Sequence, residues 1–186
     1  MAVVIGIPIL VEGRYIYSIL KGKTKPSFVA FLIFTIEMSV ILFASYSLGA
    51  HDSLLLVGTF TILHFITMLL SLKYGYVEFS RLNIFCLLMS FLGVMLWVLT
   101  DNPWYALLLN ILVDMLGYLV ITRKLTLCPG TEDSFAWGMG IVAYSLNLVL
   151  ISTWIPEEYL FSLSNVFWCS IVLLLSFRKK PKKYKR

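Results

Sequence analysis

Charge is scarce in this chain, and so are the residues on which metal and redox chemistry depend. Only 13% of its 186 residues are Asp, Glu, Lys or Arg, and it has three cysteines and two histidines. A hydrophobic fraction of 60% and a mean hydropathy of +0.90 exclude an ordinary soluble domain. Cys86, Cys128 and Cys169 form no Cys-x-x-Cys motif, which argues against a redox relay or a zinc site.

Residue patterns typical of enzyme active sites are missing from the sequence as well. His51 lies at the expected outer boundary of a membrane and His64 near its middle, too far apart to share a metal ion. No Ser-His or Cys-His spacing marks an activated nucleophile, and the last apolar stretch has no lysine for a retinal Schiff base. The sequence therefore predicts a protein without enzymatic activity, cofactor or metal.

Long apolar stretches are what the chain does have. Each is close to the ~20 residues that a helix needs to cross ~30 Å of hydrocarbon. Glu12 and Arg14 interrupt the first stretch, so we expect it to be a helix and not a cleavable signal peptide. The sequence predicts an all-α integral membrane protein with one membrane domain over 1–177 and seven transmembrane helices. The stretches run 2–20, 26–49, 53–72, 82–100, 103–122, 134–154 and 157–177.

Positive charge marks one side of this membrane domain. Of the 15 Lys and Arg, all except Arg14 follow the first, third, fifth or seventh stretch, and the other gaps hold none. The positive-inside rule makes that side cytoplasmic, with the N-terminus outside and the C-terminus inside. The compact form favours a prokaryotic cytoplasmic membrane.

The tail over 178–186 carries most of the excess charge. Its basic residues predict attraction to anionic lipid headgroups, worth about 1 kcal/mol for each charge near the surface. It lacks the aromatic interleaving that would indicate nucleic-acid binding. An alternative hypothesis makes the protein a membrane receptor, scaffold or effector subunit that acts through this tail and the loops. A simpler interpretation of the loop before the sixth stretch is that Asp133 or Ser134 caps the N-terminus of the helix that follows.

The two ends of the membrane domain resemble each other. Segment 8–12 (PILVE) aligns with 110–114 (NILVD), Lys21 with Arg123, and 70–73 (LSLK) with 175–178 (LSFR). Both copies carry a basic loop after their first helix, so they point the same way across the membrane. Three helices repeat in parallel only when an extra crossing separates the copies. The sequence predicts a 3+1+3 arrangement: repeat one over 2–72, a linker helix over 82–100 and repeat two over 103–177.

This topology resembles the SWEET and PQ-loop (MtN3-like) superfamily, which includes carriers of PnuC type. The resemblance covers essentially the whole chain and implies a small-solute transporter that works by alternating access around a midplane site. Related carriers often associate, so a homo-oligomer is also expected. In residues, the family's Pro-Gln pair is absent. Asn165 matches one of the two asparagines that SWEETs present to sugar, and His64 stands where the other would be.

Polar side chains inside the apolar stretches need a reason, since a charge at the bilayer centre costs ~2.5–3.5 kcal/mol. Counted from the basic flanks, six of them reach a similar, central depth on six different helices. The functional hypothesis is a cavity in which these residues bind substrate or carry protons, and the alternative is structural pairing between helices. The six residues are Glu12, Glu37, His64, Asp114, Asn147 and Asn165.

Arg14 is the one cation inside an apolar stretch. We expect it to be a counter-ion and to pair with another helix, because it lies about 200° around the helix from Glu12. The three carboxylates then leave an excess of negative charge in the layer. This favours a cationic, zwitterionic or nucleoside-like substrate over a neutral sugar.

Overall fold

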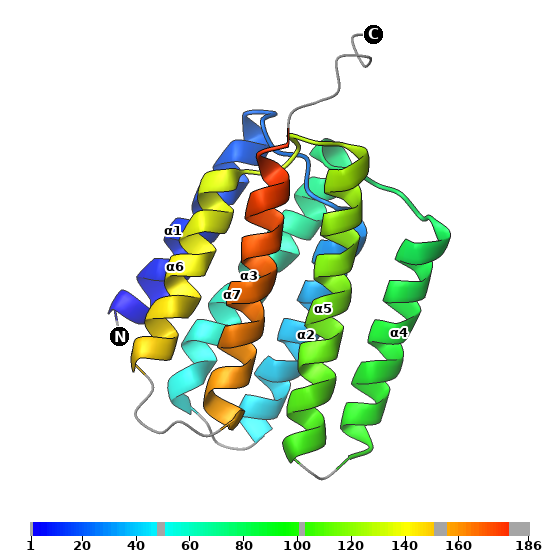
Figure 1. Ribbon diagram of the computed structural model, residues 1–186. Helices are drawn as coiled ribbons and strands as arrows, with labels where there is room; N and C mark the ends of the chain where they lie inside the picture. Colours follow the sequence, from blue (N-terminus) through cyan, green and yellow to red (C-terminus); the bar gives the residue numbers. More distant parts are fainter. Residues whose placement is uncertain (1, 48–50, 101–102, 151–155, 179–186) are drawn as a thin grey trace, which may run out of the picture.

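The computed structural model describes residues 2–47, 51–100, 103–150 and 156–178, and these form seven α-helices. The all-helical prediction is confirmed, since the described residues contain no strand and only an isolated bridge between Ser27 and Tyr76. The tail beyond Arg178 lies outside the described residues. The helices are α1 (Ala2–Leu20), α2 (Phe28–Ser47), α3 (His51–Tyr74), α4 (Arg81–Val98), α5 (Pro103–Leu127), α6 (Ser134–Leu150) and α7 (Pro156–Ser176) (Figure 1).

Helix ends agree with the sequence expectation to within a few residues, with one exception. Helix α5 was expected to end at 122, but it continues to Leu127 and takes Arg123 and Lys124 into its last turns. Helix α1 ends at Leu20, the residue expected from the sequence, and a Schellman turn follows it. Gly22 has a φ of 68°, its N–H bonds to the Ile19 carbonyl, and the next N–H reaches the Ser18 carbonyl at 3.0 Å.

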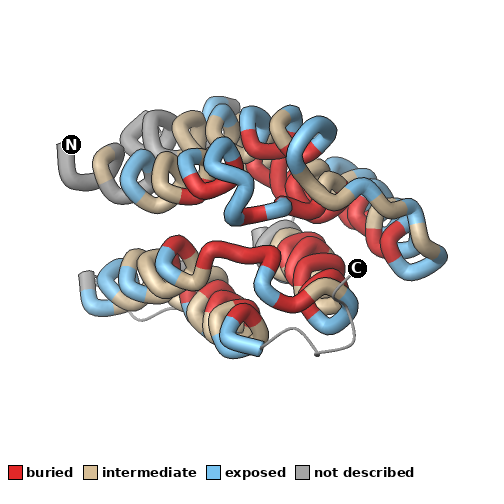
Figure 2. The backbone as a smooth tube through the Cα atoms, turned by 90° about the horizontal axis from the view of Figure 1, so that it is seen from above, coloured by how far each residue is buried: buried red, intermediate tan, exposed pale blue. Residues whose placement is uncertain are grey.

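The helices form two layers (Figures 1 and 2). In one layer α3 packs between α1 and α2, and in the other α7 packs between α5 and α6. The layers meet where α1 contacts α6 and where α2 contacts α5, an interface that we call the seam. Helix α4 packs at one edge against α5 and α2. Exchanging α1 with α5, α2 with α6 and α3 with α7 reproduces the same set of contacts within and between the layers.

The outside of the bundle is apolar and much of its inside is small or polar. Helix α4 shows this most clearly, because its buried residues are Asn83, Cys86, Ser90 and Gly93 while large apolar side chains face outward. Such an inverted pattern is typical of helices that face lipid. Within the described residues, three helical segments are long and apolar enough to cross a membrane: Val57–Tyr74, Arg81–Val98 and Tyr159–Ser176.

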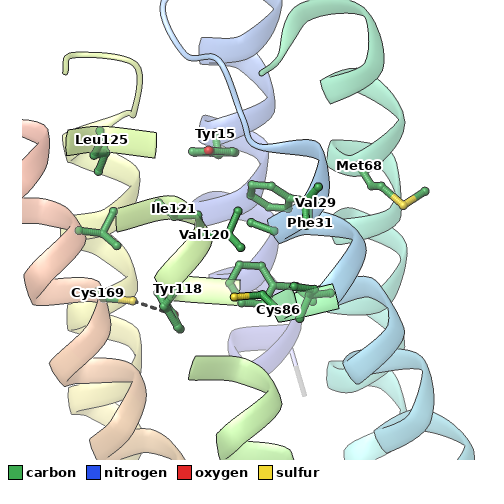
Figure 3. Close-up of a cluster of buried hydrophobic side chains, with 14 of the residues drawn as sticks. Tyr15, Val29, Phe31, Met68, Cys86, Tyr118, Val120, Ile121, Leu125 and Cys169 are labelled. Atoms are coloured by element: carbon green, nitrogen blue, oxygen red, sulfur yellow. Dashed lines mark hydrogen bonds between the residues drawn. The ribbon is translucent and has the colours of Figure 1, made fainter. Parts of the chain in front are cut away.

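Close packing at the seam depends on Gly117 of α5. An added Cβ at this position would lie 2.3 Å from a ring carbon of Phe34 on α2. That ring has little freedom to move, because it also packs against Phe31, His64 and Tyr118. Figure 3 shows the buried cluster to which Phe34 belongs, in which Phe31 of α2 and Tyr118 and Ile121 of α5 are labelled.

Gly117→Ala is therefore expected to destabilise the protein by about 1–3 kcal/mol through overpacking. Gly138→Ala on α6 is the matched control, because nothing lies within 4 Å of its added Cβ. Replacing a helical glycine there should be neutral or stabilise by up to ~1 kcal/mol. Thermal unfolding of the purified variants in detergent measures both, and equal melting temperatures would contradict the packing described.

Candidate functional site

A cavity of about 500 Å³ lies at the seam and is lined by every helix except α4. Both layers contribute to its wall. Five of the six polar residues predicted for a central layer line it: Glu12, His64, Asp114, Asn147 and Asn165. The separate helices therefore bring these side chains to one space, as depth counting along the sequence predicts.

Aromatic rings form much of the remaining wall, and no lysine or arginine belongs to it among the described residues. Tyr118 stacks on Trp168 with an angle of 11° between the rings, and Tyr15 meets Trp137 edge to face. A cavity with carboxylates, ring faces and no fixed cation suits a positively charged ligand. The aromatic lining residues are Tyr15, Phe31, Phe34, Phe60, Tyr118, Trp137, Tyr144 and Phe161.

Asp114 anchors a chain of hydrogen bonds along one side of the cavity. Its Oδ2 accepts a bond of 3.0 Å from Nδ2 of Asn165, and Oδ1 of Asn165 accepts one of 2.8 Å from the Tyr118 hydroxyl. The same hydroxyl lies 3.3 Å from Sγ of Cys169 (Figure 3). Asp114, Asn165 and Tyr118 are each less than 5% exposed. The chain joins α5 to α7 and holds the Asp114 carboxyl in a fixed position.

A second polar pair joins α1 to α3, in the other layer of helices. Nε2 of His64 lies 3.4 Å from Oε1 of Glu12. The imidazole is enclosed by the rings of Phe31, Phe34 and Phe60, whose centroids lie 5.7–5.9 Å away. On the other side of the seam, Nδ2 of Asn147 donates to the Ser162 hydroxyl at 2.7 Å.

Glu37 does not line the main cavity, contrary to the expectation from its depth. It is 3% exposed and borders a separate space of about 20 Å³ with Trp97 of α4 and Asn110 of α5. Its carboxyl group interacts directly with that of Asp114. Neither Glu37 oxygen accepts a hydrogen bond from the described residues. Glu37 therefore lies behind Asp114 as seen from the cavity.

A buried ion pair closes the end of the cavity at which the basic residues gather, and no pattern in the sequence predicts it. Lys124 of α5 pairs with Glu132, and the two side chains are 1% and 0% exposed. Glu132 also accepts bonds from the Tyr15 hydroxyl and from Nε1 of Trp137, and Lys124 donates to the Lys25 carbonyl at 2.6 Å. Because Tyr15 and Trp137 line the cavity, this lock cluster (Tyr15, Lys25, Lys124, Glu132 and Trp137) seals the cavity at that end.

Arg14 pairs with another element, but not with a carboxylate of the cavity. Its Nη2 lies 3.3 Å from Oδ2 of Asp133, and its guanidinium rests over the rings of Tyr17 and Phe135. Asp133 also caps α6 by accepting a bond of 3.0 Å from the Ala136 N–H, one of the two caps expected from the sequence. Arg14 thus ties α1 to the start of α6 and pairs with none of Glu12, Glu37 and Asp114.

Compared with known proteins, the chain matches no protein-family model, no curated protein and no solved structure. The likeness to the SWEET and PQ-loop superfamily therefore stays an expectation. What can be said of function depends on the geometry of the cavity and on the charges around it.

Removing one partner of the buried ion pair should be costly. We expect Lys124→Met to destabilise the protein by about 3–5 kcal/mol, because it leaves the Glu132 charge buried without its partner. The double variant Lys124→Met with Glu132→Gln should recover most of this loss. Unfolding in detergent measures both, and a double variant no more stable than Lys124→Met would contradict the explanation.

The neighbouring pair of Arg123 and Glu78 is the matched control. Its side chains are about 30% exposed and 2.7 Å apart. The hydrogen bond from Arg123 lowers the pKa of Glu78, so the pair stabilises the fold at neutral pH and loses its effect as the pH falls through that lowered pKa. Arg123→Met should cost no more than about 1 kcal/mol, as is usual for an exposed pair.

Proposed function

We propose that this protein is a small-solute membrane transporter of SWEET and PQ-loop type. Its seven helices cross the membrane as two parallel three-helix repeats, α1–α3 and α5–α7, joined by α4. The N-terminus faces outside and the C-terminus the cytoplasm, in a prokaryotic cytoplasmic membrane. The observation that carries the proposal is the cavity at the seam, which both repeats line and in which buried polar residues converge.

Two features support the arrangement. The helix contacts keep their pattern when α1–α3 are exchanged with α5–α7, as two equivalent bundles require. The α1–α2, α3–α4 and α5–α6 connections lie at the same end as the end of α7 (Figure 1), and the basic residues other than Arg14 and those of the tail lie in these connections or in the helix turns beside them. The positive-inside rule assigns this end to the cytoplasm.

Closure of the cavity at one end supports alternating access. The lock cluster lies at the end that we assign to the cytoplasm, while the lining extends the other way to Ile41, Val57 and Leu146. In the proposed cycle this arrangement is the state with the inner gate shut. Transport requires the two repeats to rock about the seam, breaking contacts of Lys124 and Glu132 and opening the cavity to the cytoplasm. The small residues at the α2–α5 contact allow the repeats to meet closely in one arrangement and separate in the other.

The cavity favours an organic cation with a flat ring. Glu12 and Asp114 supply negative charge, and no lysine or arginine lines the described wall. Tyr118, Trp137 and Tyr144 supply ring faces on which a delocalised cation binds well. A volume of about 500 Å³ falls in the range of small-molecule sites, which runs from about 300 to 1,000 Å³.

Thermal stabilisation by a matched pair of compounds tests this proposal. N-methylquinolinium is a flat, permanently charged ring, and quinoline is its uncharged parent. At ~100 times its dissociation constant the cation should add about 2.7 kcal/mol of stability, and quinoline at the same concentration should add much less.

Asp114→Asn should abolish the shift caused by the cation, while Glu78→Gln, outside the cavity, should leave it unchanged. A panel of amines, nucleosides, amino acids and sugars extends the test to other classes. If no compound shifts the melting temperature of the wild type at any pH, the carrier proposal fails. A receptor or scaffold role, which depends on the tail and loops, would then be the better hypothesis.

A further inference from the structure

Two carboxyl groups lie in contact behind the cavity wall without a cation to neutralise them. Glu37 of α2 and Asp114 of α5 are each 3% exposed, and their carboxyl groups interact directly. Two cations at the seam are engaged elsewhere in the described structure: Arg14 with Asp133, and Lys124 with Glu132. Asp114 accepts from Asn165, whereas Glu37 has no donor.

The other elements packed around the pair bring no compensating charge. His64 of α3 pairs with Glu12 of α1, and Cys169 of α7 bonds to Tyr118 of α5. Tyr144 of α6 lies within electrostatic range of both carboxyl groups. Helix α4 presents Gly93, Val94 and Trp97 to the space beside Glu37, and none of these is ionisable.

Two carboxylates in contact inside an apolar bundle do not both keep their charge unless a cation lies beside them. One proton shared by the pair removes the repulsion. It also gives Glu37 an O–H group that donates to Asp114, which accounts for the missing donor at Glu37. The pair is thus a binding site for a single proton.

This proton site and the cavity share Asp114. The carboxyl group of Asp114 lines the cavity while it contacts Glu37 from behind. A cation bound in the cavity stabilises the form of the pair in which both carboxyl groups are ionised, and a proton on the pair neutralises one of these two charges and weakens the attraction for the cation. The two ligands therefore compete for one negative charge.

We propose that the Glu37–Asp114 pair makes the protein an exchanger, in which one proton and one organic cation are carried in opposite directions. When the cation binds, the O–H bond of Glu37 breaks, its electron pair stays on the carboxylate, and the proton passes to water. The space of about 20 Å³ bordered by Glu37 and Asn110 is large enough for one such water molecule. Asn110 lines both this space and the main cavity, so the two are adjacent.

This inference rests on the proposed carrier function, and uptake into proteoliposomes separates the two. The membrane potential is clamped at zero, and N-methylquinolinium serves as the probe because its permanent charge prevents passive distribution with pH. With an acidic interior, the wild type should accumulate the probe about tenfold for each unit of pH difference. Without a pH difference, it should only equilibrate the probe.

Glu37→Gln is the decisive variant. It should lose accumulation driven by the pH gradient, because the remaining carboxylate cannot share a proton, yet it should still exchange labelled for unlabelled probe across the membrane. That exchange shows that the variant is folded and active. Glu78→Gln, which removes a carboxyl group outside the cavity, should accumulate the probe as the wild type does.

Each other outcome is decisive as well. Uptake by the wild type that ignores the pH gradient overturns the exchanger and leaves the carrier proposal standing, as does gradient-driven accumulation by Glu37→Gln. If Glu37→Gln does not fold, proton release from the purified wild type on addition of the probe replaces it, and a release near zero overturns the exchanger. Absence of any uptake by the wild type defeats the carrier proposal and the exchanger together.

Discussion

A buried carboxyl, carboxamide or ammonium group in an apolar bundle has little water to bond with, and its side-chain partner usually comes from another element. This constraint accounts for most of the structure. The Glu12–His64 pair joins α1 to α3, the Asp114–Asn165 bond joins α5 to α7, and the Lys124–Glu132 pair joins the end of α5 to the residues before α6. The first two bonds form within a layer of helices. The lock cluster, through Tyr15 and Lys25, bonds one layer to the other.

These bonds are distributed differently within each layer of helices and across the seam between the layers. Polar pairs join α1 to α3 in one layer and α5 and α6 to α7 in the other. At the level of the cavity the layers meet through the Glu37–Asp114 pair and through apolar contacts such as Phe34 against Gly117. Strong bonds across the seam gather at the basic end, where Lys124 and Arg14 reach across to partners. Under the proposed function, an arrangement of this kind opens at one end when few, specific bonds break, and the cavity between the layers then changes the side to which it is exposed.

Much of this organisation was predictable from the sequence because hydropathy and charge alternate so regularly. The depth of a residue along its helix comes from counting, and Glu12, His64, Asp114, Asn147 and Asn165 do line one cavity. Counting residues gives the depth of a side chain but not its direction around the helix axis. The sequence therefore predicts Glu37 in the cavity, although in the structure it borders a separate space beside α4 and α5. Which side chains pair with one another depends on which helices are neighbours in space, and no pattern in the sequence reveals this. The sequence predicts Lys124 as a loop charge because it predicts that the helix ends before this residue, and the burial of Lys124 depends on Glu132, to which no sequence pattern assigns a role.

Spin-label distances across the seam test the central claim, that the two layers rock about the cavity. Exposed positions permit this without disturbing the packing: Lys21 with Leu127 at the basic end, and Phe43 with Val149 at the other. In liposomes, changing the pH and adding N-methylquinolinium should shift the two distances in opposite directions, one widening as the other narrows. Distances that stay fixed under all conditions, or that widen and narrow together, would contradict alternating access and leave the cavity a static feature of the bundle.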